Sequence, residues 1–126
     1  MLSAKEVIQI HDLILLDEGG LAGSHGVGAL EGALARVMNR IQYVQMDDVF
    51  EIAAMYAVAI ARGHCFNDGN KRTALVSALT YLETEGVVMQ RNAQLEEIMV
   101  DVAMGLVGEE ELALILYSMH NGGTVV

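Results

Sequence analysis

The stretch from Val49 to Ile60 is apolar on nearly every side of a helix, and this feature constrains the fold most. A helix of this kind must be surrounded by other elements, because no face of it suits water. The chain has no proline, so nothing removes backbone donors from its helical patterns. Its 126 residues, 53 % of them hydrophobic, suit one domain with one core. We therefore expect an all-α fold with six helices around a central apolar helix.

Capping patterns predict where the helices begin and end. Ser3 with Glu6 matches a capping box and opens a helix that should run to about Leu16. Asp48 with Glu51 matches a second capping box, and Gly63 is expected to end that helix in the left-handed conformation. Further helices are expected over 29–40, from 70 or 71 to about 85, 93–104 and 109–120, with at most an edge strand over 87–90. The predicted domain is 1–120, followed by a flexible tail over 121–126.

Charge and composition exclude several classes of partner. Seventeen acidic residues against seven basic ones give a net charge of −10, which argues against nucleic acid or an anionic membrane as a direct partner. A single cysteine, Cys65, allows no disulfide within the chain. No signal-peptide pattern opens the sequence, and the longest apolar run, 53–61, is too short to span a bilayer. A cytoplasmic protein is the expectation.

The segment from Arg62 to Arg72 carries the strongest functional signal. It holds three of the seven basic residues of an acidic chain, and it lies between two predicted helices. The second of these helices begins at Asn70 or Lys71, and a helix N-terminus offers unpaired N–H groups to an anion. Gly69 lets the backbone approach a ligand closely, while Lys71 and Arg72 add full charges. The pattern predicts a site for phosphate or a chain of phosphates.

Two further residues of this segment suit chemistry on a phosphate. His64 is a candidate general base, because an imidazole titrates near neutral pH. Asp68 is a hard oxygen ligand that suits Mg²⁺ beside phosphate oxygens. Together they describe attack of a hydroxyl group on a nucleotide phosphate. The alternative is purely structural: His64 could cap a helix, Asp-Gly-Asn is ordinary turn chemistry, and the cations could simply be solvated.

Residues 64–72, His-Cys-Phe-Asn-Asp-Gly-Asn-Lys-Arg, resemble the motif of the Fic/Doc family, usually His-x-Phe-x-Asp/Glu-Gly-Asn-Gly-Arg. Lys71 is the variant of the Doc branch, the death-on-curing toxins of toxin–antitoxin modules. Segments 19–21, 29–36 and 48–51 also resemble Doc-family segments, in the same order, so the resemblance spans roughly Val7 to Leu116. It implies a Fic/Doc-type helical bundle.

The resemblance also implies a role for each residue of the motif. His64 would take the proton from a target hydroxyl group, Phe66 would anchor the loop in the core, and Asp68 would hold Mg²⁺ on bound ATP. The catalytic residues implied are His64, Asp68, Lys71 and Arg72. The nucleotide-binding residues expected are Gly69, Asn70, Lys71, Arg72 and Arg62, although Arg62 could equally pair with an acidic neighbour.

Two departures from the usual motif bear on the reaction. Lys71 replaces the second glycine, and Leu75 stands where a second arginine is often found. Both positions help AMP-transferring Fic proteins to seat ATP, so the resemblance implies a kinase instead. Such a kinase would transfer the γ-phosphate to a threonine of elongation factor Tu and stop translation. An AMP transferase and a non-catalytic nucleotide- or anion-binding protein remain the alternatives.

A toxin of this branch implies a cognate antitoxin protein as a partner. We expect the antitoxin to bind an exposed apolar groove near the first helices and the glycine-rich loop over 17–28. Whether this loop is ordered without a partner is left open. No role is assigned to the scattered residues His11, His25 and His120, and Cys65 lacks the companions that a structural zinc site needs.

Overall fold

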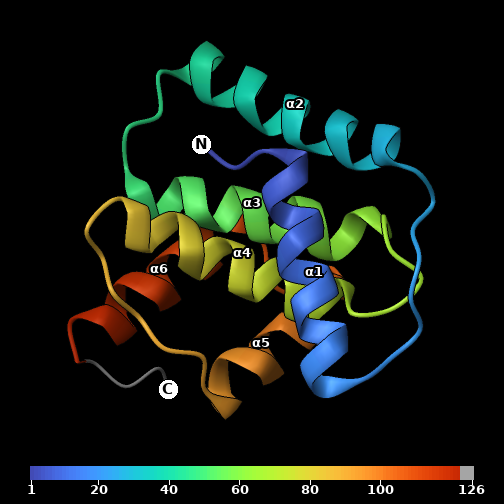
Figure 1. Cartoon of the computed structure of the whole chain (residues 1–126). Coiled ribbons are helices and arrows are strands. Elements are labelled where there is room, and N and C mark those ends of the chain that lie inside the picture. The colour runs from blue at the N-terminus through green and yellow to red at the C-terminus, as the bar shows by residue number, and fades with distance from the viewer. Residues whose placement is uncertain (123–126) are drawn as a thin grey trace.

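The computed structural model describes residues 1–122, and its fold is all-α (Figure 1). No strand occurs within the described residues, and the segment 87–90, for which the sequence allows at most an edge strand, is an irregular connection between two helices. The helices are α1 (Ala4–Glu18), α2 (Val27–Val44), α3 (Val49–Gly63), α4 (Asn70–Thr84), α5 (Ala93–Ala103) and α6 (Glu109–His120).

Helix α3 lies at the centre of the bundle, as its apolar pattern predicts. It packs against α2, α4, α5 and α6, and its most extensive contact is with α4. Helix α1 lies across α4 and also touches α2 (Figure 1). Alanines make up much of the buried surface of α3, and such small side chains let neighbouring helices come close. The buried residues of α3 are Ile52, Ala53, Ala54, Met55, Tyr56, Ala57, Val58, Ile60 and Ala61.

The N-terminal caps behave largely as the sequence predicts. Ser3 and Glu6 form the complete capping box, with reciprocal hydrogen bonds of 3.1 and 3.2 Å. The Asp48 carboxylate accepts from the backbone N–H groups of Phe50 and Glu51, which caps α3. Helix α2 is longer than the predicted 29–40. None of the described helices is long and apolar enough to cross a membrane, and the predicted tail lies mostly outside the described residues.

Candidate functional site

The predicted loop joins α3 to α4 and contains residues 64–69. Gly63 was expected to end α3 in the left-handed conformation, and this is wrong, because Gly63 stays helical and His64 takes that conformation (φ +49°, ψ +40°). The Cβ atom of any residue other than glycine makes this backbone conformation unfavourable, and residues that adopt it gather at functional sites. His64 is exposed to solvent at the sharp turn where the chain leaves the core. Its imidazole is therefore open to an incoming substrate.

Asn70 holds the loop in shape through two hydrogen bonds between its side chain and the backbone of Phe66. Its side-chain amide accepts from the N–H of Phe66 at 3.1 Å and donates to the carbonyl of Phe66 at 2.9 Å. Phe66 is buried, as the family resemblance implies. The Asn70 side chain is thus engaged by the loop itself. The Asn70 side chain therefore shapes the loop, and its expected part in binding phosphate stays a prediction.

His11 on α1 supports the motif loop, although no pattern in the sequence marks it as a site residue. It is 1 % exposed, and its ring stacks on the ring of Phe66 with centroids 3.8 Å apart and planes 10° apart. Its Nε2 atom lies 2.8 Å from the carbonyl oxygen of Asp68, while Nδ1 lies 3.2 Å from a carboxylate oxygen of Asp12. His11 therefore fixes the motif loop from beneath, at both its aromatic anchor and its acidic residue.

The glycine-rich loop is fastened to the motif loop rather than free. The N–H of His25 donates to the carbonyl of Cys65 at 2.9 Å, and the N–H of Asn67 donates to the carbonyl of Gly23 at 3.1 Å. The side-chain amide of Asn67 adds a bond of 3.1 Å to the carbonyl of Ala22. We call residues 19–25 and 65–68 the loop pair. Segments forty or more residues apart in the sequence are thus joined at the site.

The Asp68 carboxylate is held at the end of this loop pair. One oxygen accepts from the N–H of Leu21 at 3.1 Å, and the other accepts from the N–H of Gly69 at 2.8 Å. These two bonds, with smaller contributions from Arg72 and Lys71, lower the pKa of Asp68 below its ordinary value. The carboxylate therefore stays charged even in mildly acidic solution. Gly20 must be glycine, because a Cβ there would lie 2.7 Å from Asp68 Oδ2.

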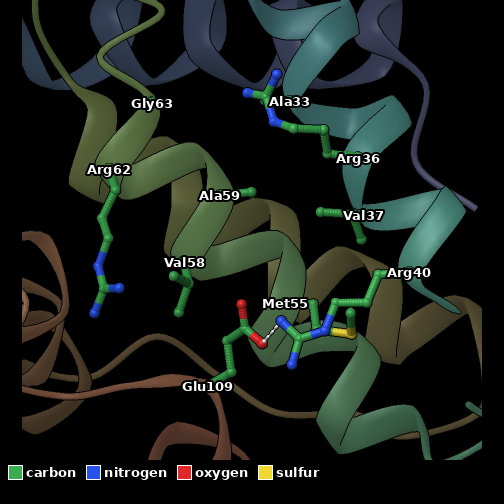
Figure 2. A pocket seen from close by; sticks show the side chains of 10 residues that line it. All are labelled: Ala33, Arg36, Val37, Arg40, Met55, Val58, Ala59, Arg62, Gly63 and Glu109. Carbon is green, nitrogen blue, oxygen red and sulfur yellow. Dashed lines mark hydrogen bonds and ion pairs between the residues drawn. The ribbon is translucent and has the colours of Figure 1, made fainter. Parts of the chain in front are cut away.

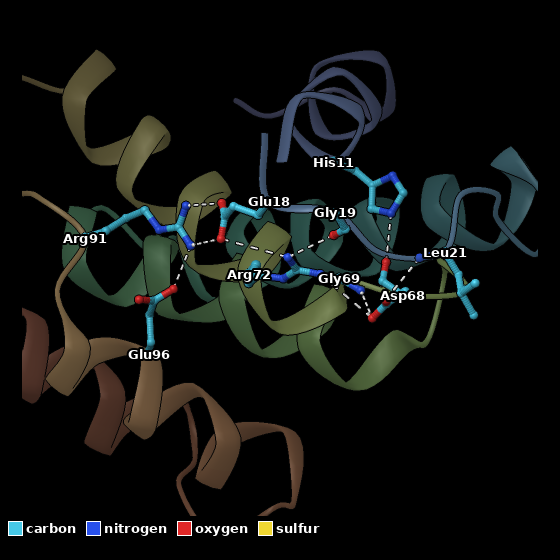
Figure 3. Close-up of polar contacts among 9 residues, drawn as sticks. All are labelled: His11, Glu18, Gly19, Leu21, Asp68, Gly69, Arg72, Arg91 and Glu96. Carbon is cyan, nitrogen blue, oxygen red and sulfur yellow. Dashed lines mark hydrogen bonds and ion pairs between the residues drawn. The ribbon is translucent and has the colours of Figure 1, made fainter. Parts of the chain in front are cut away.

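Arg72 lies in a chain of alternating charges that runs from α4 to α5 (Figure 3). Its guanidinium lies 3.9 Å from both Asp68 and Glu18 and donates to the Gly19 carbonyl at 3.3 Å. Arg91 binds both oxygens of Glu18, at 2.7 and 3.2 Å, and lowers the pKa of Glu18. The two 3.9 Å contacts of Arg72 are long, so its charge is available to a ligand that approaches α4.

The backbone at the start of α4 adds to this positive region. Gly69 is the N-cap, in the left-handed conformation (φ +79°), and no side chain caps the helix. The first N–H groups of a helix have no partner within it, so those of Lys71 and neighbouring residues can donate to an anion. The Lys71 side chain is exposed at the same end. Asp68, Gly69, Lys71 and Arg72 are therefore brought together as predicted.

Arg62 is placed elsewhere. Its Nε donates to the carbonyl of Val102 at 2.9 Å, and its Nη2 donates to the carbonyl of Val107 at 2.8 Å. Figure 2 shows its side chain pointing away from Gly63 and the start of the loop. These bonds satisfy carbonyl groups at the end of α5 and in the following turn. Arg62 thus ties α3 to the α5–α6 connection, and its expected part in nucleotide binding stays a prediction.

The acidic groups fit only one kind of metal site. Within residues 1–122, no three His, Cys, Asp or Glu side chains gather as a metal-binding group. Asp68 is a single carboxylate beside the positive end of α4. Mg²⁺ in nucleotide sites takes one or two carboxylates and completes its shell with phosphate oxygens and water. The donor set thus fits Mg²⁺ bound together with a nucleotide and does not fit a structural metal.

Comparison with known proteins finds a matching family model and similar proteins that carry the name Doc. Residues 1–82 match the model of the Fic/DOC family. The chain is 41 % identical over 112 residues to the "Protein kinase doc" of Escherichia phage P1, which covers 89 % of each protein. It is also 33 % identical over 89 residues to the "Toxin Doc" of Mycolicibacterium smegmatis (strain ATCC 700084 / mc(2)155), which covers 68 % of each.

The position of His11 generates a prediction about stability. Replacing His11 by Ala removes a buried aromatic ring and its hydrogen bond, so the free energy of unfolding should fall by about 2–4 kcal/mol. His25→Ala is the matched control, because His25 is exposed and its bond to the loop uses backbone atoms, so its change should stay within about 0.5 kcal/mol. Urea unfolding followed by circular dichroism measures both variants. Equal stability of the two variants would contradict the structural role of His11.

Proposed function

Because the chain belongs to the Fic/Doc family, we propose that it is a Doc-type toxin kinase. In this proposal it transfers the γ-phosphate of ATP to a hydroxyl group, that of a threonine, in a translation factor such as elongation factor Tu. The consequence is arrested translation, and the place of action is the cytoplasm, where ATP and translation factors meet. The observation that carries the proposal is the charged Asp68 carboxylate, held beside Arg72 and the open N-terminus of α4.

The described side chains suit the individual tasks of a phosphoryl transfer. Asp68 would hold Mg²⁺, which supplies positive charge to the phosphate oxygens of ATP. Arg72, Lys71 and the first N–H groups of α4 would bind phosphate oxygens and offset their charge. Exposed His64 would accept the proton of the acceptor hydroxyl. The acceptor oxygen bonds to the γ-phosphorus, the bond from that phosphorus to the bridging oxygen breaks, and ADP leaves.

The position of Leu75 favours the kinase over AMP transfer. Leu75 is 2 % exposed on α4 and packs in the core, one turn beyond the motif. A second phosphate-binding cation is therefore missing at that position, whereas Lys71 adds a charge nearer the start of α4. This arrangement supports a nucleotide seated differently from that of the AMP-transferring members. The name of the phage P1 relative, a protein kinase, points the same way.

Labelled ATP distinguishes the possible reactions. The protein is incubated with a bacterial cytosolic lysate and ATP that carries ³²P at either the γ- or the α-position. We expect one labelled band from γ-labelled ATP alone, at the mass of elongation factor Tu, and at least about a hundredfold loss of label with His64→Ala. His120→Ala is the matched control, because His120 is exposed at the far end of α6 and should label normally.

Other outcomes of this experiment would change the proposed reaction, the acceptor or the role of His64. A band from α-labelled ATP alone would show AMP transfer, because the γ-phosphate then leaves in pyrophosphate, and would overturn the kinase assignment. A band of another mass would retain the kinase and replace the acceptor. Equal labelling by His64→Ala and the unaltered protein would remove His64 from the reaction.

We also propose that a cognate antitoxin covers an apolar cleft beside the site. The cleft has a volume of about 540 Å³ and is lined mainly by α1, with Val76 of α4 at its edge. Leu13 and Leu16 are 65 % and 84 % exposed and line this cleft together, so they offer a contiguous apolar surface to a partner helix. Glu18 and Arg91 line the same cleft, so a bound helix would adjoin the charges around Arg72.

Replacing Leu16 by Glu should separate antitoxin binding from the reaction. A bound apolar helix of the antitoxin would bury the introduced carboxylate, so the affinity of the protein for the antitoxin should fall about tenfold or more. Labelling of the acceptor should persist, because Leu16 is exposed and lies outside the motif. Leu114→Glu is the matched control on α6, where leucine is 67 % exposed. Co-purification with the tagged antitoxin measures the effect, and equal retention of both variants would place the antitoxin elsewhere.

A further inference from the structure

An arginine-lined cleft lies between α2 and α3, apart from the loop pair and the α1 cleft (Figure 2). Its volume is about 310 Å³, and its floor is apolar, formed by side chains such as Val37, Met55 and Val58. Arg36, Arg40 and Arg62 all line it, which are three of the seven basic residues of the chain. In a chain of net charge −10, this concentration of cations in one cleft requires an explanation.

The cleft holds more positive than negative charge. Glu109 is the one acidic residue among those that line it, and it pairs with Arg40. Arg62 is fixed by its two bonds to backbone carbonyls, which neutralise no charge. Arg36 has no ion pair or hydrogen bond with any residue in 1–122. The cleft therefore presents two arginine charges that no carboxylate within it balances.

Arg36 is also directed toward the motif loop. Its Nη1 atom lies only 3.5 Å from the position that a Cβ on Gly32 would occupy. The guanidinium therefore lies back along α2 over Gly32, where the absence of a side chain leaves room for it. Figure 2 shows the Arg36 head group at the end of the cleft that holds Gly63. Gly63 directly precedes His64, and the charge of Arg36 is near enough to Cys65 to oppose the pKa increase that burial causes there. The cleft thus begins beside the proposed base.

We propose that this cleft binds an acidic segment of the protein acceptor, close to the hydroxyl group that His64 deprotonates. The inference rests on the proposed function, because it names the substrate feature that the same site recognises. Carboxylates of the segment would meet Arg36 and Arg62, and its apolar side chains would cover the floor between α2 and α3. Such contacts would raise the association rate and hold the acceptor in place, without touching ATP.

Steady-state kinetics with purified elongation factor Tu as the acceptor test the inference. Arg36→Glu should raise the KM for the acceptor about tenfold, because attraction becomes repulsion, and should leave kcat within about twofold. The affinity for a fluorescent ATP analogue should not change, since Arg36 lies outside the proposed phosphate site. Lys5→Glu is the matched control: it changes the net charge equally, and Lys5 is exposed in the first turn of α1.

The outcomes separate this inference from the proposed function. Absence of transfer by the unaltered protein would overturn both. Normal transfer with an unchanged KM in Arg36→Glu would overturn the acidic-segment site alone, and so would an equal KM increase in Lys5→Glu, which would indicate only net charge. Arg36-dependent binding of a single-stranded RNA oligonucleotide with an unchanged KM would assign the cleft to nucleic acid. Salt should raise the KM of the unaltered protein more than that of Arg36→Glu.

Discussion

The site depends on backbone hydrogen bonds between two distant loops. His25 donates to Cys65, Asn67 donates to Gly23, and Leu21 donates to the Asp68 carboxylate. Without these bonds, the carboxylate would lose its contact with the Leu21 N–H, which is the largest of the causes that lower the pKa of Asp68. The glycine-rich loop provides them because its glycines adopt positive φ angles and leave space, most directly where Gly20 meets Asp68. The buried stack of His11 on Phe66 supports the same loop from the core side.

The fold explains why this arrangement is rigid. Central α3 and its neighbour α4 pack closely, and the motif loop is the short connection between them. The loop ends are therefore fixed by the core, while α1 carries His11 and Glu18 to the loop. An electrostatic chain from Asp68 through Arg72 and Glu18 to Arg91 then connects the site to α5. Preorganised charge of this kind is what phosphoryl transfer requires of a protein.

Local patterns in the sequence were sufficient for much of this picture. The apolar run of α3 predicted its central position, and the caps at Ser3 and Asp48 predicted two helix starts. The structural roles of His11, Asn70 and Arg62 could not be predicted, because sequence patterns do not show the hydrogen-bond partners of these side chains. The partners of His11 and Arg62 on other segments are distant in the sequence, and that of Asn70 is one helical turn away. A lone histidine on an amphipathic helix carries no sign of a distant loop. Whether the loop over 17–28 is ordered could not be predicted for the same reason, since several of its hydrogen-bond partners lie on another segment.

The end of α3 was predicted incorrectly for a physical reason. Glycine is the usual residue for the left-handed conformation, so Gly63 was the natural choice over His64. The structure instead leaves the left-handed conformation to His64, and non-glycine residues in this conformation gather at functional sites. Similarly, the sequence shows that cations are scarce, but only the packing of α2 against α3 brings Arg36, Arg40 and Arg62 into one cleft.

Backbone hydrogen exchange, measured with and without ATP and Mg²⁺, tests most directly whether the loop pair builds a nucleotide site. We expect slow exchange at the amides of Leu21, His25 and Asn67 in the free protein, because each donates a hydrogen bond within the loop pair. We further expect ATP with Mg²⁺ to slow exchange at Lys71 and Arg72, whose amides have no partner within α4. Fast exchange throughout residues 19–25, or no effect of ATP at the start of α4, would contradict a nucleotide site built by the loop pair.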